Sequence, residues 1–128
     1  MEILNVLAAA LASFVFGGVW YTALAKPWMA AVDISEDEIK GSGGKGAYII
    51  AFLSAVVVAG MMRHIFNLSG IVTIDKGMIS GLGLGLFIAT PWIVTNYAFS
   101  MRPRALTLID GGFATIGCTI IGLVLSLF

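Results

Sequence analysis

Four long, mostly apolar runs divide this sequence, and they constrain its fold more than any other feature. They cover residues 3–25, 46–66, 77–101 and 105–128, and each is close to the roughly 20 residues that a helix needs to cross a bilayer. The runs do not alternate polar and apolar residues, so spanning strands are not expected. We therefore predict an all-α membrane protein of one domain, residues 1–128, with four transmembrane helices packed as a bundle.

Composition and charge narrow the possible functions. The chain is 59% hydrophobic and 11% charged, whereas a soluble domain carries about 25% charged residues. Its net charge is zero and it has no basic patch, so membrane lipid is an expected partner and nucleic acid is not. The single cysteine, Cys118, excludes an internal disulfide, and the single histidine, His64, is expected to be solvated at an interface. Catalytic, cofactor-binding and metal-ligating residues are not assigned, and an enzymatic role is not favoured.

The loops between the runs predict one short element and an orientation. Ser35 and Glu38 have the spacing of a capping box, which predicts a short interfacial helical turn, and the glycine-rich residues 41–44 follow as a linker. Basic residues favour the cytoplasmic side of a membrane. The first and third loops carry five of them and the second loop carries two, which places both termini outside the cytoplasm. The five are Lys26, Lys40, Lys45, Arg102 and Arg104.

Small residues recur every four positions along each run, so they share one helix face. The third run has the most regular stripe, which consists of Gly77, Gly81, Gly85 and Ala89. Small residues allow helix backbones to approach closely in lipid. Such a stripe can pack within the chain or against a second copy, so a homodimer through small-residue helix faces is a possible assembly.

Polar side chains inside the runs are the candidate site. Asp110 is the one acid inside an apolar run, and Asn96 lies at a similar depth, six residues before Arg102. An ionisable group in a membrane helix needs a partner and is a functional hypothesis by default. We therefore expect Asp110 to face the bundle interior. Aromatic residues with polar atoms gather at the same end, and they complete the candidate site: Trp20, Tyr21, Trp28, Tyr48 and Tyr97.

Two further residues of the runs are expected to be structural. Pro91 lies inside the third run, where it removes a backbone donor and should kink the helix, with the Thr90 hydroxyl available to compensate. Cys118 shares the small-residue side of the last run and is expected to pack there.

Three motifs in this order resemble a known family. Trp20-Tyr21 precedes Lys26-Pro27-Trp28-Met29, the segment 95–99 (Thr-Asn-Tyr-Ala-Phe) precedes Arg102-Pro103, and the segment 109–113 (Ile-Asp-Gly-Gly-Phe) begins the last run. The pattern resembles "domain of unknown function seventeen-sixty-one", a family of small, mostly bacterial integral membrane proteins. Thr22 and Ala23 depart from it, because family members often have a glycine or serine and then a proline there. The resemblance implies a four-helix protein of the bacterial inner membrane and brings no established activity.

Three classes of function remain open, and the sequence favours them in the order in which they follow. The first is a small transporter or channel subunit with a polar site near the cytoplasmic ends of the helices. Small multidrug-resistance transporters have a similar size, but they carry an acid in the first helix, and here that helix has none after Glu2. The second is a non-catalytic membrane scaffold or accessory subunit in which Asp110 and Asn96 hold helices together. The third, an enzyme acting on lipid or quinone, would normally need more than one ionisable residue.

Overall fold

The computed structural model describes residues 2–35, 37–38 and 45–128, and the elements of regular structure within these ranges are helices. This confirms the predicted all-α fold. Four helical stretches are long and apolar enough to cross a membrane: Glu2–Ala23 (α1), Lys45–Ser69 (α4), Ile74–Phe99, and Arg104–Leu125 (α7). The protein is therefore a multi-pass membrane protein by the length and composition of its helices.

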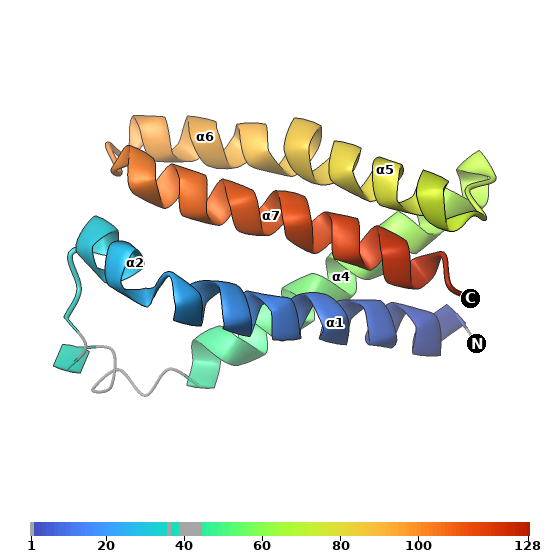
Figure 1. Ribbon diagram of the computed structural model, residues 1–128, viewed down its shortest axis with the longest axis horizontal. Helices are drawn as coiled ribbons and strands as arrows, with labels where there is room; N and C mark the ends of the chain where they lie inside the picture. Colours follow the sequence, from blue (N-terminus) through green and yellow to red (C-terminus); the bar gives the residue numbers. More distant parts are fainter. Residues whose placement is uncertain (1, 36, 39–44) are drawn as a thin grey trace.

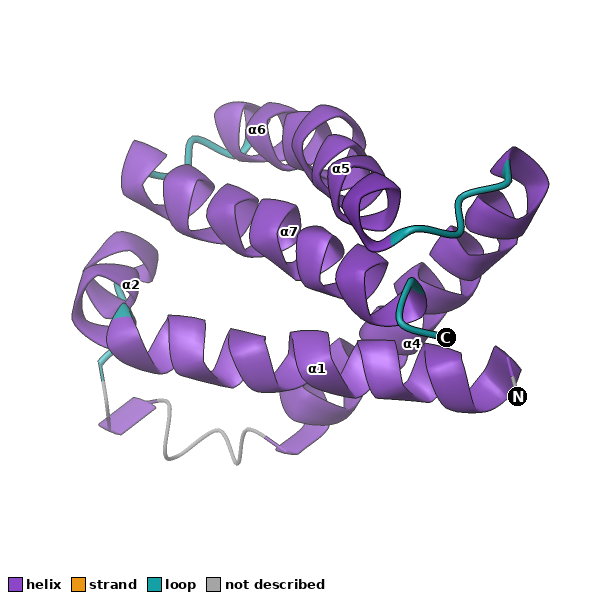
Figure 2. Ribbon diagram, turned by 45° about the vertical axis from the view of Figure 1, so that its right-hand side comes forward, coloured by secondary structure: helices purple, strands orange, loops and turns teal. Residues whose placement is uncertain are grey.

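Helix α7 is the centre of the bundle. It packs along α1 on one side and along the stretch Ile74–Phe99 on the other, while α4 crosses behind and packs mainly against α1 (Figures 1 and 2). The two chain ends lie together at one end of the bundle (Figure 1). We call that end the Arg63 end. The opposite end, where α1 finishes and α7 begins, is called the Asp110 end.

The third spanning stretch contains a wide turn before Pro91. Helix α5 (Ile74–Leu84) passes into a π-helical segment, η1 (Gly85–Ala89), and continues as α6 (Thr90–Phe99). The backbone N–H of Thr90 donates to the carbonyl of Gly85, five residues earlier, and the Thr90 hydroxyl donates to the same oxygen at 2.7 Å. Proline in a regular α-helix clashes with the carbonyl four residues before it. A wider turn immediately before Pro91 accommodates that conflict, and the Thr90 hydroxyl stabilises the turn.

Pro27 explains where the first span stops. A continuous helix would need an N–H at residue 27 to bind the carbonyl of Ala23, and proline has none. Helix α1 ends at Ala23, Leu24 leaves helical geometry (φ −105°, ψ 20°), and a short helix, α2 (Ala25–Val32), begins in a new direction. This helix packs against α7 and stops at Asp33, whose φ of 59° is left-handed. The sequence patterns did not indicate α2.

The proposed capping box lies just beyond α2. The Ser35 hydroxyl accepts a hydrogen bond from the backbone N–H of Glu38 at 3.2 Å and donates to its carboxyl group at 3.2 Å. The first of these bonds is one of the two that make up a capping box. The linker predicted at residues 41–44 lies outside the described residues.

The glycine stripe of the third span packs within the chain. A side chain at Gly85 would lie 2.7 Å from the Ala114 carbonyl oxygen, and one at Gly81 would overlap the Cys118 carbonyl. These glycines let the backbones of α5 and α7 touch, as the packing interpretation of the stripe expects. The homodimer stays a prediction. On α4, Ala47 and Ala51 have the same four-residue spacing and are exposed, so this face is available for contact with a second copy.

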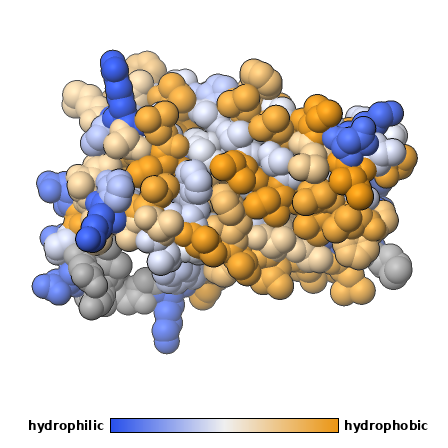
Figure 3. Space-filling model, viewed as in Figure 1, coloured by the Kyte–Doolittle hydropathy of each residue, from blue (hydrophilic) through white to orange (hydrophobic). Residues whose placement is uncertain are grey.

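The buried hydrophobic core lies toward one end of the bundle. Toward the Arg63 end, small and aliphatic residues with one phenylalanine form a core between α1, α4 and α7: Ala9, Ala10, Ala59, Met62, Phe66, Ile121 and Leu125. Apolar side chains also cover much of the outside, and hydrophilic residues gather at the two ends of the visible face (Figure 3). This distribution fits a lipid environment around the middle of the bundle.

Candidate functional site

Asp110 lies in the second turn of α7 and joins three helices. The hydroxyl of Tyr21, near the end of α1, donates to its Oδ1 atom, and the hydroxyl of Tyr97, near the end of α6, donates to its Oδ2 atom. Each carboxyl oxygen therefore accepts from a different helix. We call this arrangement the tyrosine clamp, defined by Tyr21, Asp110 and Tyr97.

Trp20 adds a second link between α1 and α7. Its indole N–H donates to the carbonyl oxygen of Ile109 at 2.9 Å, and its ring lies against Gly112. A side chain at Gly112 would approach the Trp20 ring to 2.9 Å, so the contact depends on glycine. The Ile-Asp-Gly-Gly segment thus supplies an acceptor carbonyl, a carboxyl group and an open backbone surface on consecutive residues.

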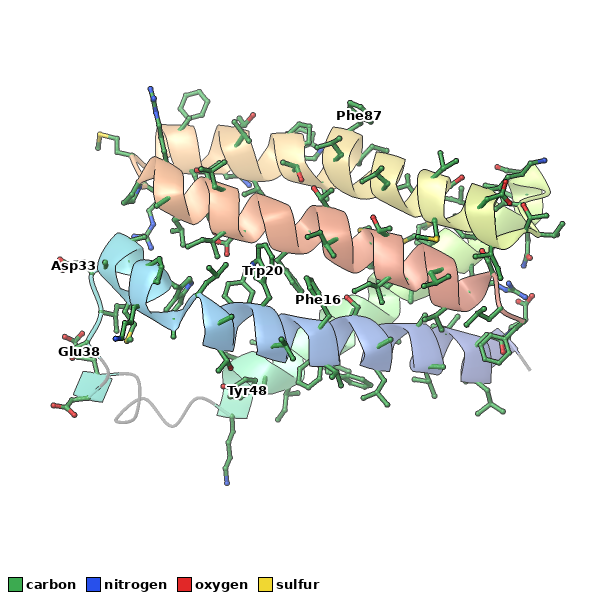
Figure 4. All side chains as sticks on the ribbon, in the orientation of Figure 1. Phe16, Trp20, Asp33, Glu38, Tyr48 and Phe87 are labelled. Atoms are coloured by element: carbon green, nitrogen blue, oxygen red, sulfur yellow. The ribbon has the colours of Figure 1, made fainter. Side chains whose placement is uncertain are left out.

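Aromatic rings fill the space beside the clamp. Phe113 stacks on Phe16 with ring centroids 6.0 Å apart and meets Tyr21 at 5.4 Å in a tilted arrangement. Phe16 also meets Trp20 at 5.7 Å, and both side chains point from α1 toward α7 (Figure 4). Phe113 lies over Gly17, where an added side chain would come within 2.9 Å of its ring. Aromatic packing therefore holds Tyr21 in position for Asp110.

Hydroxyl groups continue the polar contacts along α7 toward its middle. Besides binding Gly85, the Thr90 hydroxyl lies 3.2 Å from the Gly111 carbonyl oxygen and 3.0 Å from the hydroxyl of Thr115. The Thr119 hydroxyl donates to the Thr115 carbonyl oxygen at 2.8 Å. The π-helical segment is thereby tied to α7 one turn beyond the clamp.

Comparisons with known proteins can now be set beside this geometry. A protein-family model matches residues 4–126, which is nearly the whole chain. The chain belongs to the family described as Protein of unknown function (DUF1761). Comparison with curated proteins and with solved structures finds no match. Membership in DUF1761 fits the resemblance carried by the Trp-Tyr, Thr-Asn-Tyr and Ile-Asp-Gly-Gly motifs.

The structure brings together four of the seven residues proposed for the site of this DUF1761 protein. Tyr21, Tyr97 and Asp110 form the clamp, and Trp20 lies beside it. Among the described residues, no hydrogen bond or ring contact joins the side chains of the other three to the clamp. Asn96 is exposed on α6, Tyr48 is 66% exposed on α4, and Trp28 is half-buried on α2. Figure 4 labels Trp20 and Tyr48, which lie on different helices.

Sequence reasoning missed Phe16, Phe113 and Thr115 as parts of the site. Phe113 belongs to a motif that carries the family resemblance, so its position offered a signal. Phe16 offered one as well, because it lies four residues before Trp20 and shares its helix face. Thr115 offered only its place in the four-residue spacing of small residues along the last run, which gives no sign of its contact with the Thr90 hydroxyl.

In the tyrosine clamp, both oxygens of the carboxyl group already accept hydrogen bonds. Two phenol hydroxyls bind the two oxygens of Asp110, and the described residues provide no group of three or more His, Cys, Asp or Glu side chains that could hold a metal ion. The two hollows described on the surface lie elsewhere, one between α1 and α4 and one beside α2. The arrangement can fasten helices, and it can respond to a proton placed on the carboxyl group.

Proposed function

We propose that this DUF1761 protein is a non-catalytic membrane scaffold or accessory subunit whose central acid holds the bundle together. The observation that carries this proposal is the pairing of both Asp110 oxygens with hydroxyl groups from α1 and α6. A carboxyl group inside a membrane protein is costly unless it is paired. Here the pairing fastens the ends of three spans, which is the structural role of an interhelical hydrogen bond in lipid.

Several features support a structural role over catalysis. A general acid or base must reach the proton that it transfers, and both oxygens of Asp110 are already engaged by the Tyr21 and Tyr97 hydroxyls. The Trp20 bond to Ile109 and the stacking of Phe16 on Phe113 strengthen the same seam. We place the protein in the bacterial inner membrane with both termini outside the cytoplasm, in keeping with the family resemblance and the distribution of basic residues.

One observation favours a small transporter or channel subunit as a second candidate. Asp110 is only half-buried, and it is the junction of three helices. A proton on the carboxyl group would convert one of its oxygens from an acceptor into a donor, so the tyrosine paired with that oxygen would have to turn its hydroxyl and accept. Protonation would also replace charge-assisted hydrogen bonds with weaker neutral ones, which would loosen α1 or α6 on α7. Such coupling between a proton and helix position is what a proton-driven transporter requires.

Ion flux in liposomes separates the two candidates. Purified protein is reconstituted with a pH-sensitive dye inside the vesicles, and a pH gradient is imposed with and without Na⁺ or K⁺. The scaffold proposal expects vesicles with the wild type and vesicles with Asp110→Asn to show the same flux as vesicles without protein. Proton or cation flux from the wild type that Asp110→Asn abolishes, while the variant stays folded and monodisperse, would overturn the scaffold proposal and favour transport.

A further inference from the structure

A groove between α1 and α4 opens at the Arg63 end of the bundle. Its volume is about 390 Å³, and its apolar walls are Ile3, Val6 and Leu7 from α1 and Val56 and Gly60 from α4. Gly60 leaves space in this groove, because the nearest side-chain atom to a Cβ placed there is Val6 Cγ1, at 4.0 Å. None of these residues belongs to the tyrosine clamp.

Polar and charged side chains line the outer end of the groove. Arg63 donates from Nη1 to the Leu125 carbonyl oxygen at 3.2 Å, and its Nε atom lies 3.6 Å from Oε1 of Glu2. The amide of Asn67 donates to the same Glu2 oxygen at 3.0 Å. His64 completes this end and is exposed. Among the described residues, this polar end therefore carries the positive charge of Arg63 and the negative charge of Glu2.

The length of the groove matches one leaflet of a bilayer. Along α4 it extends from Asn67 to Val56, which is eleven residues and about 16 Å at roughly 1.5 Å per residue. Half of a hydrocarbon core about 30 Å thick is about 15 Å. The polar end therefore lies at the headgroup level when the apolar end reaches the middle of the membrane.

The geometry points to a phospholipid of the adjacent leaflet as the occupant, with a zwitterionic, ammonium-bearing headgroup such as phosphatidylethanolamine. One acyl chain lies along Val6, Val56 and Gly60. The headgroup ammonium binds the carboxyl group of Glu2, which is 63% exposed on its side chain. The phosphate binds the imidazole N–H of His64, beside the positive charge of Arg63, whose side chain is 18% exposed and lines the groove.

Charge complementarity selects this headgroup over an anionic one. The Arg63 and Glu2 charges cancel at the polar end, so a lipid with both an ammonium group and a phosphate leaves no charge unpaired. A phosphatidylglycerol headgroup would bring its phosphate but would leave Glu2 facing a second anion. Phosphatidylcholine carries a quaternary ammonium, which has no N–H to donate to the carboxyl group.

Native mass spectrometry of the purified protein tests this site. The wild type in detergent is titrated with equal amounts of phosphatidylethanolamine, phosphatidylglycerol and phosphatidylcholine of matched acyl chains. We expect retained one-to-one adducts with phosphatidylethanolamine, at roughly fivefold higher occupancy than with phosphatidylglycerol, which corresponds to about 1 kcal/mol. Equal occupancy by all three lipids, or a preference for phosphatidylglycerol, would overturn the headgroup assignment.

Three variants separate the two parts of the groove. Gly60→Leu fills the apolar channel and should reduce all adducts, whereas Gly18→Leu, at an exposed glycine of α1 with no atom within 4 Å, should leave them unchanged. Glu2→Gln should keep the adducts and remove the preference for phosphatidylethanolamine. Adducts that persist in a folded Gly60→Leu protein would overturn the site. The Glu2→Gln result decides the headgroup contact even where Gly60→Leu fails to fold.

Discussion

Tyr21 and Asp110 are 89 residues apart in the chain, and the tyrosine hydroxyl donates directly to the Oδ1 atom of the carboxyl group. The bond connects the end of the first span to the beginning of the last. Tyr97 occupies the other oxygen from the end of the third span. Asp110 is thus an acceptor shared by the first and third helical spans, and its chemistry determines how tightly their ends are held at the Asp110 end.

The first prediction concerns replacement of the acid. Asp110→Ala leaves two hydroxyl groups without their acceptor and should lower the free energy of unfolding by about 1–3 kcal/mol, since interhelical hydrogen bonds in membranes contribute about 0.6 kcal/mol on average and up to about 1.7. Asp110→Asn should cost less than about 1 kcal/mol, because an amide can accept from one tyrosine and donate to the other. Unfolding by sodium dodecyl sulfate in mixed micelles measures both. Equal stability of Asp110→Ala and wild type would contradict a structural role.

The second prediction isolates one bond of the clamp. Tyr21→Phe should cost about 0.5–1.5 kcal/mol in the wild type and close to nothing in Asp110→Ala, because the acceptor is already missing there. Tyr48→Phe is the matched control, since Tyr48 is 66% exposed on α4. The same unfolding titration gives the coupling energy. A Tyr21→Phe cost that is unchanged in Asp110→Ala would mean that the hydroxyl acts through another partner.

The sequence determined the four spans because the length of an apolar run is a direct physical requirement of the bilayer. It also indicated that Asp110 would face inward, because an unpaired acid in lipid is costly. It could not determine the rotation of each helix. Asn96 and Tyr97 are adjacent and differ by about 100° around α6. Tyr97 reaches Asp110 and Asn96 is exposed, and nothing in the local pattern distinguishes them.

Other features depend on contacts distant in the chain or on backbone geometry. Helix α2 is short, and its direction follows from the break that Pro27 imposes on α1. The π-helical segment Gly85–Ala89 depends on how α7 receives the Thr90 hydroxyl, which lies near both Gly111 and Thr115. Such features follow from backbone geometry at the two prolines together with packing between spans, and hydropathy along one run does not reveal them.

The third prediction tests the close approach of η1 and α7. Gly85→Leu should destabilise the fold by about 3 kcal/mol or more, because a Cβ atom there would lie 2.7 Å from the backbone of Ala114 and backbone cannot rotate away. Gly83→Leu is the matched control on the same helical stretch, because no atom lies within 4 Å of a side chain at Gly83. Both are measured by unfolding in mixed micelles. Equal losses in the two variants would show that a larger side chain anywhere on this stretch, and not contact with α7, is responsible.

The last prediction concerns orientation in the membrane. Five basic residues in the first and third loops, against Arg63 and Lys76 on the other side, place the Asp110 end in the cytoplasm. In a Cys118→Ser background, a cysteine at Ser69 should react with an impermeant thiol reagent in intact cells, because Ser69 ends α4 at the Arg63 end and is exposed. A cysteine at Ser35, exposed beyond α2, should react only after the cells are permeabilised. Labelling of Ser35→Cys in intact cells, with Ser69→Cys protected, would reverse the orientation and place the tyrosine clamp on the outer side.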